Sequence, residues 1–176
     1  MPRRAYATAA IAALVFSVSS VHAASADANA LYQQGLKALA GDGRAIDLQA
    51  GRDLLERAAA AGSVGAMQRL GELYRDGDGG VAKDYAKAFD WFSKEAALPN
   101  GARGMIGVAM CYEHGQGVTK DVAQSEEWYK KAAAAAQKGA MAGDLDCMIA
   151  LAQCYAEGHG IKQDPVQAWN WAIKAS

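Results

Sequence analysis

The sequence predicts an all-α protein, an α-solenoid of about four helix-turn-helix repeats. One pattern, a Tyr followed by Gly-x-Gly, a small aliphatic residue, an Asp and a Trp, occurs three times. The tyrosines Tyr74, Tyr112 and Tyr155 are 38 and 43 residues apart. The apolar residues before each Tyr recur at helical spacing. Repetition with a period of about 20–50 residues is typical of stacked repeat proteins.

The repeated glycines and aspartates indicate where each pair of helices turns. Glycine accepts the left-handed conformation at a helix C-terminus, so Gly-x-Gly predicts the end of the first helix. The Asp accepts hydrogen bonds from free backbone N–H groups and predicts the start of the second helix. The repeated aromatic residues are expected in the core between stacked helices. The matched sets are Tyr74, Gly77, Gly79, Val81, Asp84 and Trp91; Tyr112, Gly115, Gly117, Val118, Asp121 and Trp128; and Tyr155, Gly158, Gly160, Ile161, Asp164 and Trp171.

The first residues have the composition of a secretory signal peptide. Arg3 and Arg4 precede an apolar run over residues 5–21, and small residues then favour cleavage after Ala23, with Ala26 as the second option. The run is shorter than the roughly 20 apolar residues that span a membrane as a helix. We therefore expect an exported protein without a stable membrane anchor.

The predicted organisation is a signal peptide at 1–23, a short N-terminal tail at 24–28 and a repeat domain at 29–176. Two helical segments, 30–40 and 48–61, flank the sequence GDGR and form a first unit that lacks the repeated Tyr and Trp, as terminal repeats often do. Residues 133–144 are longer than the corresponding segment of other repeats, which predicts an extended helix end and a loop. The repeats are expected at approximately 29–63, 64–101, 102–139 and 144–176.

The repeated string A-x-x-x-L-G-x-x-Y-x-x-G-x-G-V-x-x-D-x-x-x-A-x-x-W-x-x-K-A-A resembles the Sel-one-like repeat, a relative of the tetratricopeptide repeat. The second repeat matches best, with Leu70, Gly71, Tyr74, Gly77, Gly79, Val81, Asp84, Ala88, Trp91 and Lys94. The resemblance implies a right-handed α-solenoid that contacts other proteins. Exported bacterial members of this family look like adaptors in envelope assembly, export, signalling or toxin neutralisation.

Cysteine is sparse, and its three positions do not form a disulfide framework. Cys111 and Cys154 both precede the repeated Tyr, where Leu73 stands in the second repeat, so this position favours a buried apolar group. Cys147 and Cys154 share one helix and lie too far apart along it to bridge while the helix is intact. A disulfide between Cys111 and either of the others stays an alternative.

The sequence predicts no catalytic residue. Ser63 misses a Gly-x-Ser-x-Gly elbow, and the chain has neither Ser-x-x-Lys nor a phosphate-binding loop. Some disulfide-rich relatives of the family are described as β-lactam-binding or hydrolysing, but their regular Cys pair in each repeat is absent here. The net charge of −1 is dispersed, whereas a nucleic-acid-binding protein needs a basic face.

Metal binding is the one alternative chemistry that the Gly loops suggest. Their polar residues lack the ligand series of a calcium loop and equally suit an exposed loop. We therefore expect neither a metal nor a cofactor. The loop residues with metal-ligating side chains are Asp76, Asp78, His114, Glu157 and His159.

A partner-binding surface is predicted on the concave face, which the first helices of tetratricopeptide-like stacks line. Ile106 and Met110 are four residues apart and therefore neighbours on one helix face. An apolar patch with a charged rim is typical of a recognition groove. The alternative is that the segment near Ala140 covers these residues. The predicted surface consists of Gln68, Glu72, Arg75, Ile106, Met110, Glu113, Ile149 and Gln153.

The C-terminal end gives a second hypothesis about contacts. Solenoids need polar caps for solubility, but the last helical segment carries Trp169, Trp171 and Ile173. Either Trp169 turns inward, or this end meets a partner or a second copy of the chain.

The predicted function is that of a non-catalytic, periplasmic adaptor that binds another protein in the cell envelope. Within binding, the alternative is an immunity or inhibitor protein that acts against a secreted toxin. A β-lactamase-like envelope hydrolase is disfavoured, because the sequence lacks a nucleophile with a neighbouring base. Binding of glycan strands is a further alternative.

Overall fold

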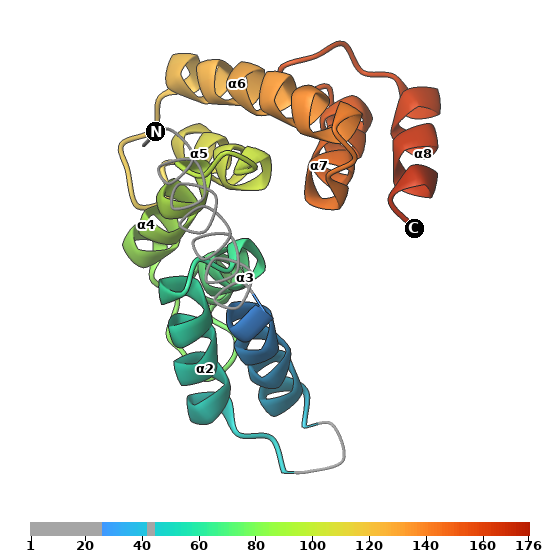
Figure 1. Cartoon of the computed structure of the whole chain (residues 1–176). Coiled ribbons are helices and arrows are strands. Elements are labelled where there is room, and N and C mark those ends of the chain that lie inside the picture. Colours follow the sequence, from blue (N-terminus) through green and yellow to red (C-terminus); the bar gives the residue numbers. More distant parts are fainter. Residues whose placement is uncertain (1–25, 42–44) are drawn as a thin grey trace, which may run out of the picture. The chain divides into compact units, whose positions relative to one another are not determined.

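The computed structural model describes residues 26–41 and 45–176. All regular secondary structure in these two ranges is helical, which confirms the predicted all-α class (Figure 1). No helix among these residues is long and apolar enough to cross a membrane. The expected signal peptide at 1–23 lies outside the described residues.

The chain divides into two compact units, Met1–Ala66 and Met67–Ser176. The described part of the first unit contains a helix over residues 26–40 and α2 (Leu48–Ala60). Both helices expected in the first repeat are therefore present. The helix over residues 26–40 begins inside the segment 24–28 that was expected to be an N-terminal tail. Ala28 of that segment is helical and only 3% exposed.

The two helices of the first unit approach closely at glycines. A Cβ atom on Gly51 would lie 2.7 Å from the side chain of Leu39, and one on Gly35 would lie 3.0 Å from that of Leu55. Asp47 begins α2, because its carboxylate accepts a 2.9 Å hydrogen bond from the Ala50 N–H group.

The second unit is itself a stack of helix pairs joined by Gly loops. α4 packs against α5, α5 against α6 and α7, α6 against α7, and α7 against α8. Contacts between α5 and α7, two first helices, are what a stacked repeat requires. The helices are α3 (Val64–Asp76), which begins just before the unit boundary, α4 (Tyr85–Ala96), α5 (Ala102–His114), α6 (Val122–Met141), α7 (Leu145–Glu157) and α8 (Pro165–Lys174).

The loop glycines end the first helices as the sequence predicts. Gly115 and Gly158 have φ values of 69° and 77°, and their N–H groups bond the carbonyls of Cys111 and Cys154. Gly77 has φ 72° at the corresponding position of the second repeat. Any other residue type would be strained in this left-handed conformation.

The repeated aspartates begin the second helices, also as predicted. Asp84 and Asp121 each accept a 3.0 Å hydrogen bond from the N–H group three residues later. Asp164 likewise accepts a 3.0 Å hydrogen bond from the N–H group of Gln167, and Pro165 is the first residue of α8. The N–H group of each capping Asp also bonds the carbonyl of the repeated Tyr, at 2.7 Å from Asp84 to Tyr74, 2.9 Å from Asp121 to Tyr112 and 2.9 Å from Asp164 to Tyr155.

The extended helix end predicted over 133–144 is present. α6 has 20 residues and ends at Met141, followed by Gly143 with φ 88°. The additional turns of α6 are alanine-rich, and Ala136 and Ala140 are buried. The extra length therefore adds packing surface for α7 instead of an irregular loop.

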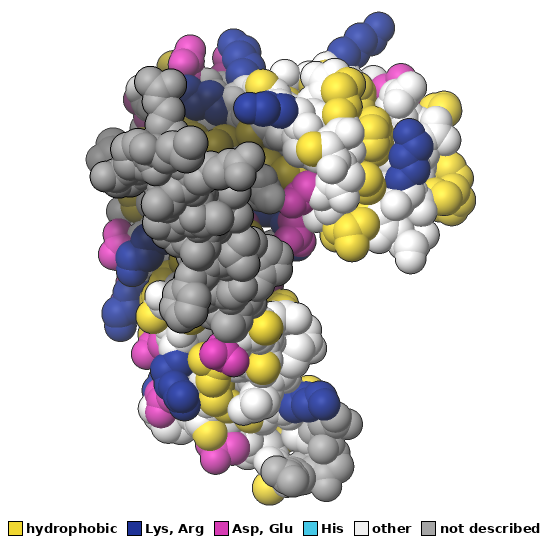
Figure 2. Space-filling view, in the orientation of Figure 1, with side chains coloured by type: hydrophobic (Ala, Val, Ile, Leu, Met, Phe, Trp, Pro, Cys, Tyr) yellow, Lys and Arg dark blue, Asp and Glu magenta, His cyan; other side chains and the backbone are white. Residues whose placement is uncertain are grey.

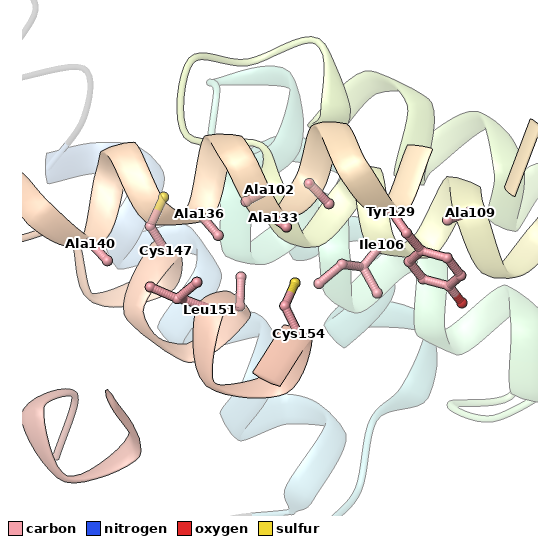
Figure 3. Packing of buried hydrophobic residues seen from close by; sticks show 12 residues of the cluster. Ala102, Ile106, Ala109, Tyr129, Ala133, Ala136, Ala140, Cys147, Leu151 and Cys154 are labelled. Atoms are coloured by element: carbon pink, nitrogen blue, oxygen red, sulfur yellow. The ribbon is translucent and has the colours of Figure 1, made fainter. Parts of the chain in front are cut away.

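The core of the last two repeats is made mainly of alanine and cysteine side chains from α5, α6 and α7, together with three larger side chains (Figure 3). All three cysteines are buried free thiols, and Cys147 and Cys154 belong to this cluster. Its buried members are Ala102, Ile106, Ala109, Tyr129, Ala132, Ala133, Ala136, Ala140, Cys147, Ala150, Leu151 and Cys154.

The repeated tryptophans pack less deeply than a core position requires. Trp91 and Trp128, expected in the core, are only half-buried, as is Trp171. The ammonium group of the Lys three residues later lies over each indole ring. Such a cation–π contact stabilises by about 0.5–1 kcal/mol at exposed sites. The pairs are Lys94 over Trp91 at 3.9 Å, Lys131 over Trp128 at 4.7 Å and Lys174 over Trp171 at 4.1 Å.

Candidate partner-binding surface

The expected surface residues lie on the first helices of three successive repeats, α3, α5 and α7. Seven of the eight are at least partly exposed, and Ile149 is 41% exposed. Ile106 is the exception, with an exposed fraction of 3%. The seven residues that we call the first-helix surface are Gln68, Glu72 and Arg75 on α3, Met110 and Glu113 on α5, and Ile149 and Gln153 on α7.

The prediction that Ile106 is exposed was wrong. Its side chain lies in the core beside Tyr129 and Cys154 (Figure 3). The physical reason is the stacking itself, because α7 packs directly against α5. The same repeat position in α7 is Ile149, which no following helix of the described chain encloses. Exposure at this position therefore depends on the next repeat.

The apolar part of the first-helix surface consists of Met110 and Ile149. Met110 is half-buried against the core cluster and presents the rest of its flexible side chain. The segment near Ala140, expected as an alternative cover, is the helical end of α6 and leaves Ile149 exposed. A partner could therefore make apolar contacts with both α5 and α7, which pack against each other.

Hydrogen bonds to neighbouring side chains hold the polar residues of α3. Gln68 Nε2 donates to Glu72 Oε1 at 3.1 Å, and Arg69 lies 3.4 Å from the other oxygen. Arg75 donates two hydrogen bonds, of 2.8 and 2.9 Å, to the carboxylate of Asp76. The bonds from Arg75 hold the pKa of Asp76 below its usual value, although burial opposes the shift.

The buried side chain of Tyr129 holds Glu113, the first-helix-surface residue nearest the C-terminal end of α5. Tyr129 Oη donates a 2.8 Å hydrogen bond to Glu113 Oε2, and the His159 ring stacks on the Tyr129 ring at 3.8 Å. His159 Nδ1 lies 2.9 Å from Glu157 Oε2. Burial, aided by this hydrogen bond and by the nearby carboxylates, raises the pKa of Tyr129, so its hydroxyl stays a donor. The sequence does not predict this cluster, because no other repeat has Tyr at that position.

Glu95 is a second group whose environment the repeat pattern does not predict. It stands in α4 where the next repeat has Ala132, and its exposed fraction is 0%. Neither carboxylate oxygen has a hydrogen-bond partner among the described residues. Burial raises its pKa to about 8, which the charge of Arg103 opposes. At neutral pH this side chain is mostly protonated in the folded protein.

The cysteine thiols are poorly suited to nucleophilic chemistry. Burial raises the pKa of Cys111 and Cys154 to about 11 and that of Cys147 to about 12. The thiolate is the reactive form, so these groups are almost entirely protonated near pH 7. In the described ranges, no three His, Cys, Asp or Glu side chains are arranged to hold a metal ion.

The C-terminal end carries a groove of about 500 Å³ between α7 and α8. Trp169 and Ile173 are 67% and 54% exposed, so Trp169 does not turn inward, while Trp171 is half-buried. The groove is lined by Ala152, Gln153, Ala156, Glu157, Pro165, Ala168, Trp169 and Ala172.

Comparison with solved structures places this helical stack among known repeat proteins. A crystal structure of c5321, a protective antigen present in uropathogenic Escherichia coli strains and displaying an SLR fold, matches with a TM-score of 0.56 and 32% identity. The match covers 84% of this chain and 30% of that chain. A Sel1 repeat protein from Oxalobacter formigenes matches with a TM-score of 0.53 and 28% identity, over 84% of this chain and 55% of that one.

The chain therefore spans about a third and about half the length of these two proteins. No curated protein matches it. The family model of the Sel1 repeat matches four segments, residues 23–63, 64–100, 102–137 and 145–176. These segments cover most of the sequence, and the helical stack agrees with them. The chain belongs to the Sel1 repeat family, and its fold is that family's α-solenoid.

Proposed function

We propose that this protein is a non-catalytic adaptor of the bacterial periplasm that binds another envelope protein through its first-helix surface. Sel1 repeats indicate a scaffold for protein–protein interaction. The observation that carries the proposal is that Ile149 on α7 is exposed and Met110 on α5 is only half-buried, while these two helices pack against each other. Two apolar side chains at such a junction favour contact with a protein.

The polar part of the surface supports selective binding. Neighbouring side chains already hold Glu72, Arg75 and Glu113 through hydrogen bonds. Because these side chains are already ordered, binding a partner costs less conformational entropy than it would if they were free. Charged groups at the rim of an interface contribute mainly to specificity and to the rate of encounter. We expect a partner that presents an apolar segment flanked by both signs of charge.

Export to the periplasm rests on the N-terminal sequence alone. The two arginines, the apolar run over residues 5–21 and the small residues before position 24 favour a signal peptide. The test is fractionation of cells that produce the full chain with a C-terminal tag. Recovery of a shortened chain in the periplasmic fraction supports export, and a full-length cytoplasmic chain contradicts it.

The hydrolase alternative is tested by turnover of a chromogenic β-lactam. The buried thiols have raised pKa values and do not supply a ready nucleophile. Turnover that survives purification and follows the protein through two columns would overturn the non-catalytic assignment.

Affinity capture from envelope extract tests the binding surface. The Met110→Asp/Ile149→Asp double variant places two charges on the first-helix surface. The matched control is Val122→Asp/Met141→Asp, which makes the same charge change at α6 positions that are 53% and 72% exposed. A protein retained by the wild type and the control but lost with the first variant supports the proposal, provided that circular dichroism shows all three folded.

We also propose that the C-terminal end is a second contact surface. Trp169 and Ile173 expose more than half of their side-chain area, and they are four residues apart in α8 and therefore neighbours on one helix face. Large exposed apolar groups that lie together mark interaction sites more often than single ones do.

A further inference from the structure

The last turn of α4 encloses the carboxyl group of Glu95. The acidic side chains visible in Figure 2 lie at the surface, whereas Glu95 is 0% exposed. Within residues 26–41 and 45–176, neither of its carboxylate oxygens has a hydrogen-bond partner. Burying a charge without a partner is costly, so this environment favours the neutral acid. Glu95 thus has the burial of a core residue and the chemistry of a titratable one.

Glycines of α5 close the space around this side chain. A Cβ atom on Gly104 would lie 2.7 Å from the Cβ atom of Glu95, and one on Gly101 would overlap the Glu95 carbonyl oxygen. The start of α5 therefore rests directly on the end of α4. Because water does not reach the carboxyl here, an ionised Glu95 has to find its counter-charge within the protein.

The residue next to this close contact is Arg103, which pairs with a different helix. Arg103 Nη1 lies 3.7 Å from Asp146 Oδ1, and this ion pair joins the start of α5 to the start of α7. Both side chains are partly exposed, at 30% and 51%. Partly exposed ion pairs stabilise a protein only weakly, so Arg103 leaves Asp146 at little cost when a stronger acceptor is present.

Charged groups from three neighbouring helices act on Glu95. In the part of the chain that the structure describes, the strongest are Arg103 on α5, Asp146 on α7 and Glu72 on α3. Burial is the main reason that the pKa of Glu95 is raised to about 8, and the two carboxylates act in the same direction. The positive charge of Arg103 opposes the shift. One guanidinium therefore interacts with both a buried acid and an exposed one.

We propose that Glu95 and Asp146 compete for Arg103, and that loss of the Glu95 proton moves the guanidinium from the α7 carboxylate to the buried one. While Glu95 is neutral, Arg103 joins α5 to α7. Once Glu95 is ionised, it attracts Arg103 more strongly than Asp146 does, because opposite charges interact more strongly away from water. In alkaline solution, α5 and α7 then lose an ion pair that joins them. These two helices carry Met110 and Ile149 of the first-helix surface.

A second polar contact at the same helix ends keeps the exchange local. Asn100, which lies just before α5, donates a 2.6 Å hydrogen bond from Nδ2 to Asp144 Oδ2. The other oxygen of Asp144 accepts a 2.8 Å hydrogen bond from the Cys147 N–H group and so caps α7. Because neither bond involves Arg103, we expect α7 to stay capped and in place when the guanidinium moves.

NMR spectroscopy of the Arg103 side chain tests the exchange on protein produced from the complete sequence in an exporting host. Spectra are recorded from about pH 6 to about pH 9.5, on either side of the Glu95 pKa. In alkaline solution the Hε proton of a solvent-facing arginine exchanges rapidly with water. At about pH 9.5 the Arg103 proton should exchange at least about tenfold more slowly in wild type than in Glu95→Gln, as a hydrogen bond to a charged group predicts. Near pH 6 the two rates should agree.

A second variant keeps the test decisive if Glu95→Gln fails to fold. Asp146→Asn removes the competing carboxylate at a partly exposed position. Protection of the Arg103 proton should then appear at a lower pH than in wild type. Glu126→Gln, at an exposed position of α6, is the matched control and should behave as wild type.

Three results would overturn the exchange. Equal rates for the Arg103 proton in wild type and Glu95→Gln at about pH 9.5 would show that the guanidinium stays with Asp146. Protection that appears at the same pH in wild type and Asp146→Asn would show that the two carboxylates do not compete. Loss of the helical circular dichroism signal above pH 8 in wild type, but not in Glu95→Gln, would show that ionised Glu95 unfolds the helices instead of taking a new partner.

Discussion

The imidazole ring of His159 stacks on the phenol ring of Tyr129, with centroids 3.8 Å apart and planes 15° from parallel. Tyr129 belongs to α6 in the third repeat, and His159 follows α7 in the fourth, so the contact joins two repeats. The Tyr129 hydroxyl also holds Glu113 on the first-helix surface. One side chain thereby fixes both the junction and part of the candidate binding surface.

Removing the Tyr129 hydroxyl should weaken this junction. Tyr129→Phe is expected to lower the free energy of unfolding by about 1–2 kcal/mol, because the Glu113 carboxylate loses the hydroxyl that donates to it. Glu113→Ala should cost a similar amount, and the double variant less than the sum of the two. Chemical denaturation of all four proteins measures the coupling, and strictly additive losses would contradict a direct interaction.

The buried carboxyl of Glu95 should make stability depend on pH. Its pKa is about 8 in the folded chain, above its ordinary value of 4.5. The folded state therefore keeps a proton that the unfolded state releases, and the associated stability is complete below about pH 4.5 and falls as pH rises towards 8. At pH 7 the loss is on the order of 3 kcal/mol, from 1.36 kcal/mol per pKa unit.

Glu95→Gln removes this titration with little change in shape. Its stability relative to wild type should therefore improve steadily from pH 4.5 to pH 8, whatever the cost of burying the amide. Glu126→Gln, at an exposed position of α6, is the matched control and should follow the wild-type pH dependence. The free energy of unfolding is measured by denaturation at each pH. If its pH dependence is the same for wild type and Glu95→Gln, the raised pKa of the buried Glu95 carboxyl is contradicted.

The Phe92 ring lies between two helix backbones, at Gly71 of α3 and Gly107 of α5. Gly107→Ala would place a methyl group about 2.5 Å from the ring and should destabilise the protein by about 1–3 kcal/mol, despite the better helix propensity of Ala. Adding Phe92→Leu should recover part of that loss. Thermal unfolding of the single and double variants checks this, and a Gly107→Ala protein as stable as wild type would show that the helices are further apart.

The three cysteines should be inert in the folded protein. They are buried, and burial raises their pKa values to about 11–12. A thiol-specific reagent at pH 8 should label them only as fast as the chain opens, and all three at once in denaturant. Rapid labelling of one thiol in the native state would show that its part of the core is accessible.

Much of the fold could be predicted because its signals are local. Gly115 and Asp121 act on their own helix ends, through a left-handed backbone and a capping hydrogen bond, so their roles do not depend on distant residues. The long α6 was predicted from sequence as well, because residues 133–144 are longer than the corresponding segment of the other repeats.

Burial between repeats could not be predicted in the same way. Ile106 and Ile149 occupy one repeat position, yet the first is buried by α7 and the second is exposed. Glu95 follows Lys94 near the end of a helix and looks like a solvent-exposed residue in sequence. Its burial depends on how closely α5 approaches α4, which the glycines Gly101 and Gly104 permit.

The central claim is that the first-helix surface binds a protein, and an equilibrium titration of the captured partner tests it most directly. Met110→Asp/Ile149→Asp should raise the dissociation constant at least about thirtyfold. Val122→Asp/Met141→Asp, with the same charge change on α6, should alter it by less than about threefold. Equal affinity of the wild type and the first variant, both folded, would contradict the account.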